Sequence, residues 1–105
     1  MSMDERYFIP ASEEHLAREK RKARELRQSQ WWKNRCGEGR CHYCGEPFPP
    51  RELTMDHLVP LVRGGISAKS NVVPCCKECN NQKRYLLPWE WEEYQERLQG
   101  GGHQG

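Results

Sequence analysis

Two Cys-x-x-Cys pairs are the most chemically distinctive feature of this 105-residue sequence. Each pair, Cys41/Cys44 and Cys76/Cys79, can direct two sulfurs toward one side of a tetrahedral ion, and together they supply the four ligands of a zinc site. A closed four-sulfur site has no open coordination position, so we expect this zinc to stabilise the fold rather than to catalyse a reaction. The 31 residues between Cys44 and Cys76 exceed the ~15–20 of the commonest zinc patterns, so the pairs enclose something larger than a simple finger.

A thiol redox protein is the alternative interpretation of a Cys-x-x-Cys pair. The presence of two such pairs in one short chain argues against it. Of the other two cysteines, Cys75 could replace Cys76 only by giving up the Cys-x-x-Cys spacing, and Cys36 has no second cysteine at that spacing.

An ordered set of polar residues, prolines and glycines lies between the two pairs and just after them. In sequence order the set is Asp56-His57, Pro60, Gly64-Gly65, Asn71 and Cys76-x-x-Cys79-Asn80-x-x-Lys83. This set resembles the HNH nucleases, a family with a ββα-metal (His-Me finger) fold. The sequence departs from the letters H-N-H at the third position, where Asn80 replaces a histidine, a variant that is familiar in the family.

The resemblance implies a small α+β fold in which a ββα-metal core with a four-cysteine zinc site is flanked by helices. It implies that His57 is catalytic and that Asn71 orients the His57 loop by hydrogen bonding. Asp56 and Asn80 would hold a second metal ion that grips the scissile phosphate. The implied substrate is DNA, cut to leave 5′-phosphate and 3′-hydroxyl ends.

The chemistry of phosphodiester hydrolysis agrees with these assignments. The reaction needs a group that deprotonates water and a cation that neutralises the charge developing on phosphorus. An imidazole with a pKa near ~6.5 suits the first task, which points to His57. Asp56 and Asn80 both present oxygens, the ligands that Mg²⁺ or Mn²⁺ prefers. Adjacent residues on a regular strand point to opposite faces, so we expect Asp56 and His57 to lie where their strand ends.

The remaining sequence predicts the elements that position this site. A charged helix is expected over Ser12–Lys33, because Ser12 is a suitable N-cap and Gly and Pro are absent. Short strands are expected at Leu53–Met55 and Asn71–Val73, followed by a helix over Cys79–Leu87 that stops before Pro88.

A last helix is expected over Pro88–Leu98, with Trp91, Tyr94 and Leu98 at helical spacing in the core and a flexible tail after it. The chain therefore divides into an N-terminal arm and basic helix (1–35), a zinc-stabilised nuclease core (36–87), a packing helix (88–99) and a tail (100–105).

Contact with nucleic acid must come from local basic patches. The formal net charge is +2, and four thiolates on one Zn²⁺ would bring the chain close to neutrality. Basic residues dominate the N-terminal helix, which is either a solvated face or a DNA-backbone contact. The acidic residues of the last helix should keep it away from DNA. The phosphate contacts that we expect are Arg63, Lys69, Lys83 and Arg84.

Composition indicates a small reduced protein with a thin core. Hydrophobic residues make up 35% of the chain and charged residues 30%, so the zinc must supply much of the stability. No secretory signal and no apolar run near the ~20 residues of a membrane span are visible, which predicts a cytoplasmic protein with reduced cysteines.

The leading hypothesis is a DNA endonuclease with one structural Zn²⁺ and one catalytic Mg²⁺ or Mn²⁺. One active site cuts one strand, so a monomer is expected to nick double-stranded DNA, without a protein or membrane partner. The alternative is a non-catalytic zinc module that binds DNA or protein. Loss of Asp56, His57 or Asn80 would favour that alternative, and all three are present.

Overall fold

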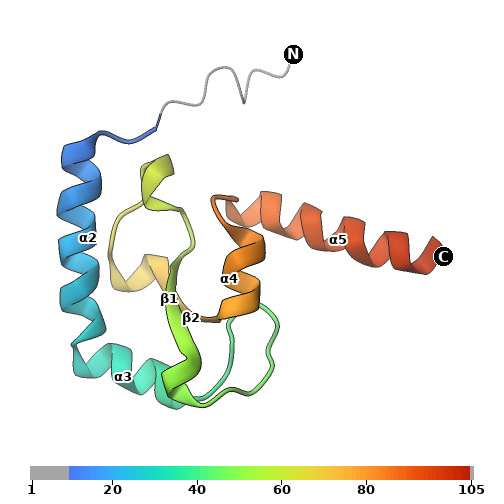
Figure 1. Ribbon diagram of the computed structural model, residues 1–105, viewed down its shortest axis with the longest axis horizontal. Coiled ribbons are helices and arrows are strands. Elements are labelled where there is room, and N and C mark those ends of the chain that lie inside the picture. The colour runs from blue at the N-terminus through green and yellow to red at the C-terminus, as the bar shows by residue number, and fades with distance from the viewer. Residues whose placement is uncertain (1–9, 105) are drawn as a thin grey trace.

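The computed structural model describes residues 10–104, with side chains described as far as residue 98. Two strands form an antiparallel hairpin, and helices lie on both sides of it (Figure 1). The elements are α2 (Glu13–Arg27), α3 (Gln30–Gly37), β1 (Leu53–His57), β2 (Val72–Cys76), α4 (Lys77–Lys83) and α5 (Pro88–Gln104). Three short 3-10 helices join them: η1 (Pro50–Glu52), η2 (Leu61–Arg63) and η3 (Lys69–Asn71). This is the predicted small α+β fold.

The hairpin and α4 form a continuous ββα unit. The register pairs Leu53 with Cys76 and His57 with Val72, so the two strands are paired along their whole length. Helix α4 follows β2 without a loop, because the Cys76 sulfur accepts a hydrogen bond from the Cys79 N–H and caps the first turn. Strand β2 also contains Pro74, which a two-stranded sheet tolerates at an edge. The Pro74 carbonyl accepts the His42 N–H at 2.8 Å, so the 41–44 loop covers that edge.

The single helix predicted over Ser12–Lys33 is wrong, because the chain forms two helices that meet at Ser29. The Ser29 hydroxyl accepts the Trp32 N–H at 3.2 Å and donates to the Leu26 carbonyl at 2.6 Å. A serine that bonds both flanking turns in this way ends one helix and caps the next. The N-cap predicted at Ser12 is confirmed, since its hydroxyl accepts the His15 N–H at 3.0 Å.

The helix predicted over Cys79–Leu87 is displaced toward the N-terminus and ends at Lys83. Arg84 leaves helical geometry with φ +49°, which stops the helix before Pro88 can do so. The predicted start of the last helix is confirmed at Pro88. Its first turn is closed by the Glu90 carboxylate, which accepts the Leu87 N–H at 2.8 Å.

The last helix differs from the prediction at its far end. Trp91 is buried, but Leu98 is 55% exposed and is therefore not part of the core. The helix continues to Gln104, through most of the predicted flexible tail. Gly105 lies outside the described residues.

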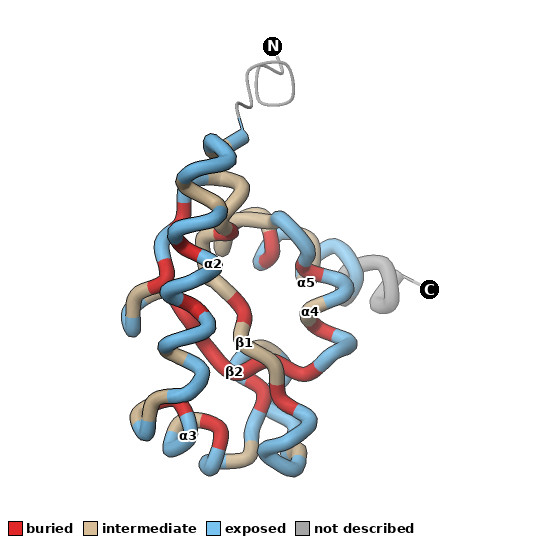
Figure 2. The backbone as a smooth tube through the Cα atoms, turned by 60° about the vertical axis from the view of Figure 1, so that its left-hand side comes forward, coloured by how far each residue is buried: buried red, intermediate tan, exposed pale blue. Residues whose placement is uncertain are grey.

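The hydrophobic core is small and rich in cysteine. It lies between α3, the hairpin and the start of α4, where Figure 2 shows β2 buried along its length and β1 only partly buried. Its buried members are Trp32, Cys36, Cys41, Leu53, Val72, Cys75, Cys76 and Cys79. Because three of these eight side chains, Cys41, Cys76 and Cys79, are zinc-ligand candidates, core packing and metal binding involve the same residues. No helix in the described part of the chain is long and apolar enough to cross a membrane.

Candidate active site and metal centre

The four predicted zinc ligands come together at one end of the hairpin. The sulfurs of Cys41, Cys44, Cys76 and Cys79 all lie within 4.8 Å of one another. Backbone N–H groups point at two of them: those of Tyr43 and Cys44 contact the Cys41 sulfur at 3.3 and 3.5 Å, and that of Cys79 contacts the Cys76 sulfur at 3.5 Å. Four sulfurs in this arrangement fit the tetrahedral coordination of Zn²⁺.

The thiols of the four-cysteine cluster differ in their pKa values. Burial raises the pKa of Cys79 and of Cys44. Burial also opposes ionisation of Cys41, but the backbone N–H groups around its sulfur lower its pKa to about 7. A bound Zn²⁺ would displace the protons of the remaining thiols. The other buried cysteines, Cys36 and Cys75, lie outside the cluster.

The Asp56 carboxylate faces α4 and forms a buried ion pair with Lys83. The Lys83 ammonium lies 3.3 Å from Asp56 Oδ2, and the relative exposures are 0% for Lys83 and 7% for Asp56. The same oxygen accepts the Tyr43 hydroxyl at 2.5 Å, and burial together with this bond raises the pKa of Tyr43. Lys83 also donates to the carbonyls of His57 and Leu58, at 3.2 and 3.3 Å. This burial is contrary to the phosphate contact predicted for Lys83, since its ammonium is already fully engaged inside the protein.

Asn80 lies one turn before Lys83 on α4 and faces the same side of β1. Its amide nitrogen lies 3.1 Å from the hydroxyl of Thr54, two residues before Asp56 and on the same face of the strand. Asp56 Oδ1 and Asn80 Oδ1 have no hydrogen-bond partner within residues 10–98. The structure thus places the two predicted oxygen ligands on facing elements, β1 and α4, with one oxygen of each still available.

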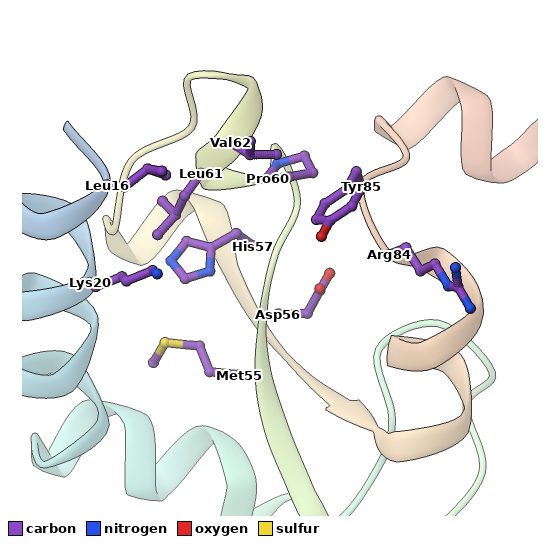
Figure 3. Close-up of a pocket in the computed structure, with 10 residues that line it drawn as sticks. All are labelled: Leu16, Lys20, Met55, Asp56, His57, Pro60, Leu61, Val62, Arg84 and Tyr85. Atoms are coloured by element: carbon purple, nitrogen blue, oxygen red, sulfur yellow. The ribbon is translucent and has the colours of Figure 1, made fainter. Parts of the chain in front are cut away.

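His57 lies on the other side of β1, toward α2. Figure 3 shows the His57 imidazole near Lys20 and the Asp56 carboxylate near Tyr85 and Arg84, with the strand between them. Asp56 and His57 are the last two residues of β1. Their side chains point to opposite faces of the strand, as expected for neighbouring residues. Both nevertheless line one cavity of about 360 Å³. Burial lowers the pKa of His57, against the opposing effect of the Asp56 charge.

Asn71 ties together the loop that follows His57. Its side-chain carbonyl accepts the Val59 N–H at 2.9 Å, and its amide nitrogen donates to the carbonyls of Val59 and Ile66 at 3.1 and 2.8 Å. Gly65 allows the loop to close this tightly, because a Cβ there would stand 1.8 Å from the Val59 oxygen. These bonds have the geometry that the predicted orienting role of Asn71 requires.

The predicted DNA contacts do not form one patch. Arg84 is exposed and lines the cavity. Arg63 lies 2.8 Å from the Glu90 carboxylate and also donates to the Tyr85 carbonyl. Lys69 is exposed but stacks over the Trp31 ring, 5.5 Å from its centroid, and does not line the cavity.

Three residues near the site were not found from the sequence. Lys20 lines the cavity from α2, Ser67 contacts the His57 imidazole at 3.0 Å, and Glu19 is buried against Ser67. A signal for Glu19 was present, since it interrupts the apolar stripe of Leu16, Ala23 and Leu26. Ser67 carries no comparable signal in a loop of small residues.

The central part of the chain is similar to a known protein family. Residues 41–85, less than half of the 105 residues, match the family model described as HNH endonuclease. This segment contains the ββα unit and both cysteine pairs, and it is similar to the HNH endonucleases. A relative is the CRISPR-associated endonuclease Cas9 of Corynebacterium diphtheriae, 39% identical over 44 residues, which are 41% of this chain. The match spans only 4% of the length of that Cas9.

Proposed function

We propose that this chain is a metal-dependent DNA endonuclease in which His57 activates the attacking water. The observation that carries the proposal is that His57 and Asp56 line the same cavity, while Asn80 contacts Thr54, which shares a strand face with Asp56, from α4. The proposed base and one proposed oxygen ligand thus line one cavity, and the second ligand, Asn80, lies on α4 beside the Asp56 face of β1. The match of residues 41–85 to the HNH endonuclease model supports the same reaction class.

His57 is suited to accept a proton at neutral pH. Its lowered pKa keeps the imidazole neutral, so a lone pair is available for the hydrogen of a water molecule. Asn71 holds the loop after His57 by three hydrogen bonds, which limits the positions that the imidazole can take.

The donor set of Asp56 and Asn80 fits a hard divalent cation. Carboxylate and carboxamide oxygens are ligands for Mg²⁺ or Mn²⁺, and this cation would supply charge neutralisation at the scissile phosphate. Lys83 already balances the Asp56 charge at 3.3 Å, so the protein alone offers the cation little net negative charge. We therefore propose that phosphate oxygens of DNA contribute to cation binding.

Two basic side chains line the cavity where DNA would enter. Lys20 and Arg84 are both exposed there, and they approach from α2 and from the end of α4. We assign them to phosphates that flank the scissile one. The described residues contain one such site, so a monomer would nick duplex DNA, leaving 5′-phosphate and 3′-hydroxyl ends. The four-cysteine zinc would hold the 41–44 loop and α4 in place.

The ion pair between Asp56 and Lys83 also favours a second candidate function. A cation beside the carboxylate disfavours a divalent metal there, as expected of a zinc module that binds DNA without cutting it. This alternative predicts DNA binding that is independent of Mg²⁺ and Mn²⁺.

A duplex oligonucleotide labelled differently on its two strands separates the candidates. The nuclease proposal predicts cleavage with Mg²⁺ or Mn²⁺ that is lost in EDTA and in Asp56→Asn, with one strand cut per binding event. DNA ligase should reseal the nick, because the ends carry 5′-phosphate and 3′-hydroxyl. Tight binding without cleavage in either metal would support the zinc-module alternative instead.

A further inference from the structure

Ser67 connects the backbone of α2 to the imidazole of His57. Its hydroxyl oxygen lies 3.0 Å from His57 Nε2 and 2.6 Å from the main-chain carbonyl oxygen of Glu19. The contact is shielded from water, since Ser67 is 9% exposed and Glu19 is 2% exposed. A chain of two hydrogen bonds therefore runs from a helix backbone to the proposed catalytic base.

The chemistry of these groups determines where the hydrogens lie. A serine hydroxyl has one hydrogen, and a carbonyl oxygen can only accept. At 2.6 Å the Ser67 hydrogen must point to the Glu19 carbonyl, because two lone pairs would otherwise face each other. The Ser67 oxygen is then an acceptor toward His57, so His57 Nε2 carries the hydrogen. His57 Nδ1 keeps its lone pair and has no hydrogen-bond partner in residues 10–98.

We propose that Ser67 and Glu19 are positioning residues that hold the His57 imidazole in its Nε2–H tautomer. The nitrogen that accepts the proton of water is then Nδ1. This role of Nδ1 rests on the proposed nuclease function, whereas the tautomer itself does not. Without the Ser67 hydroxyl, the imidazole could take either tautomer and either ring orientation.

The Glu19 carboxylate fixes the position of Ser67 through a separate bond. It accepts the Ser67 N–H at 2.7 Å and lies 3.5 Å from the Lys22 ammonium and 3.6 Å from the Arg18 guanidinium. The Glu19 carboxylate thus accepts the Ser67 N–H, and the Glu19 main-chain carbonyl accepts the Ser67 hydroxyl hydrogen. The bonds to the hydroxyl and to the N–H can be removed one at a time.

Helix α2 is anchored to the same loop at a second point. His15 lies four residues before Glu19 on α2, and its Nε2 lies 2.8 Å from the Gly65 carbonyl. His15 does not contact His57, so it offers a control that weakens helix docking without touching the imidazole. Because α2 lies outside the family match at 41–85, the active site of this chain extends beyond the family segment.

The tautomer is measurable without any cleavage assay. We suggest long-range ¹H–¹⁵N correlation spectra of histidine-labelled, zinc-loaded full chain at about pH 8, where an ordinary imidazole with a pKa near ~6.5 is neutral. The chain has four histidines, and the His57 signals can be assigned with His57→Gln. We expect a single Nε2–H form in the wild type and in His15→Ala. A Nδ1–H wild type would overturn the proposal whatever the variants do.

Ser67→Ala removes the hydroxyl and keeps the N–H that Glu19 binds. We expect both tautomers in Ser67→Ala and a return to the single form in Ser67→Thr. At saturating DNA, kcat of Ser67→Ala should fall roughly 10–100-fold with KM unchanged, because a displaced base loses its alignment with water. An unchanged spectrum or an unchanged kcat in Ser67→Ala would contradict the positioning role. A wild type with the expected tautomer that cuts no DNA would support the positioning contact and contradict the nuclease proposal.

Discussion

The Lys83 ammonium lies 3.3 Å from the Asp56 carboxylate, and both side chains are buried between β1 and α4. This pair joins the strand that carries the proposed catalytic residues to the helix that carries Asn80. It also balances the charge of a proposed metal ligand inside the protein. Lys83 is therefore assigned to the framework of the site rather than to its DNA-binding surface.

Removing the buried cation should destabilise the fold. Lys83→Met keeps most of the side-chain stem but leaves the Asp56 carboxylate buried without its cation. We expect the free energy of unfolding to fall by about 3–5 kcal/mol, the usual cost of breaking a buried ion pair from one side. Urea unfolding of the zinc-loaded protein measures this change. The matched control is Lys33→Met on exposed α3 surface, and equal stability of the two variants would refute the assignment.

The site was predictable where chemistry depends on spacing along the chain. The four clustered cysteines could be predicted because two Cys-x-x-Cys pairs are informative by themselves. The roles of Asp56, His57 and Asn80 come from the resemblance to the HNH nucleases and stay predictions. The environment of Lys83 was not predictable, because a lysine near a helix end is usually a solvated charge. Its contact with Asp56, 27 residues earlier in the sequence, forms only in the folded structure. The helix break at Ser29 was missed for a related reason: whether a serine caps or interrupts a helix depends on bonds to both flanking turns.

The zinc prediction can be tested by stoichiometry. We expect one tightly bound Zn²⁺ per chain and loss of the folded circular-dichroism spectrum on chelation, because structural zinc contributes on the order of 10–16 kcal/mol in small modules. Cys76→Ser should lose the metal. Cys36→Ala should retain one equivalent, since Cys36 is buried but lies outside the cluster. A zinc content that falls equally in both variants would contradict the four-sulfur site.

The stability contributed by Glu19 should depend on pH. The hydrogen bond from the Ser67 N–H, which outweighs the opposing effect of burial, lowers the pKa of Glu19 below its value in the unfolded chain. Its contribution is therefore complete above the unfolded pKa of ~4.3 and is lost as pH falls through the folded value. We expect the stability gap between wild type and Glu19→Gln to be widest near neutral pH and to narrow below about pH 4. Urea unfolding across this range at constant free zinc measures the gap, and a gap that does not change with pH would exclude a lowered pKa.

The two basic residues that line the cavity should contribute to the salt dependence of DNA binding. Neutralising one phosphate contact lowers the slope of log K against log salt by about 0.9. We expect that decrease for Arg84→Gln and for Lys20→Gln, and no decrease for Lys33→Gln, which does not line the cavity. Fluorescence anisotropy in EDTA gives the slopes without cleavage. Equal slopes for all three variants and the wild type would show that DNA does not contact this cavity through Lys20 or Arg84.

The most direct test of the proposed nuclease activity is conversion of supercoiled plasmid by zinc-loaded protein, in EDTA and then with Mg²⁺ or Mn²⁺. We expect open circles that depend on the added metal, and a rate that falls roughly 10²–10⁴-fold in His57→Ala, because the general base is removed. The structure should survive this substitution, which circular dichroism and zinc content will check. Intact plasmid with folded wild type in both metals, or undiminished cleavage by His57→Ala, would contradict the proposal.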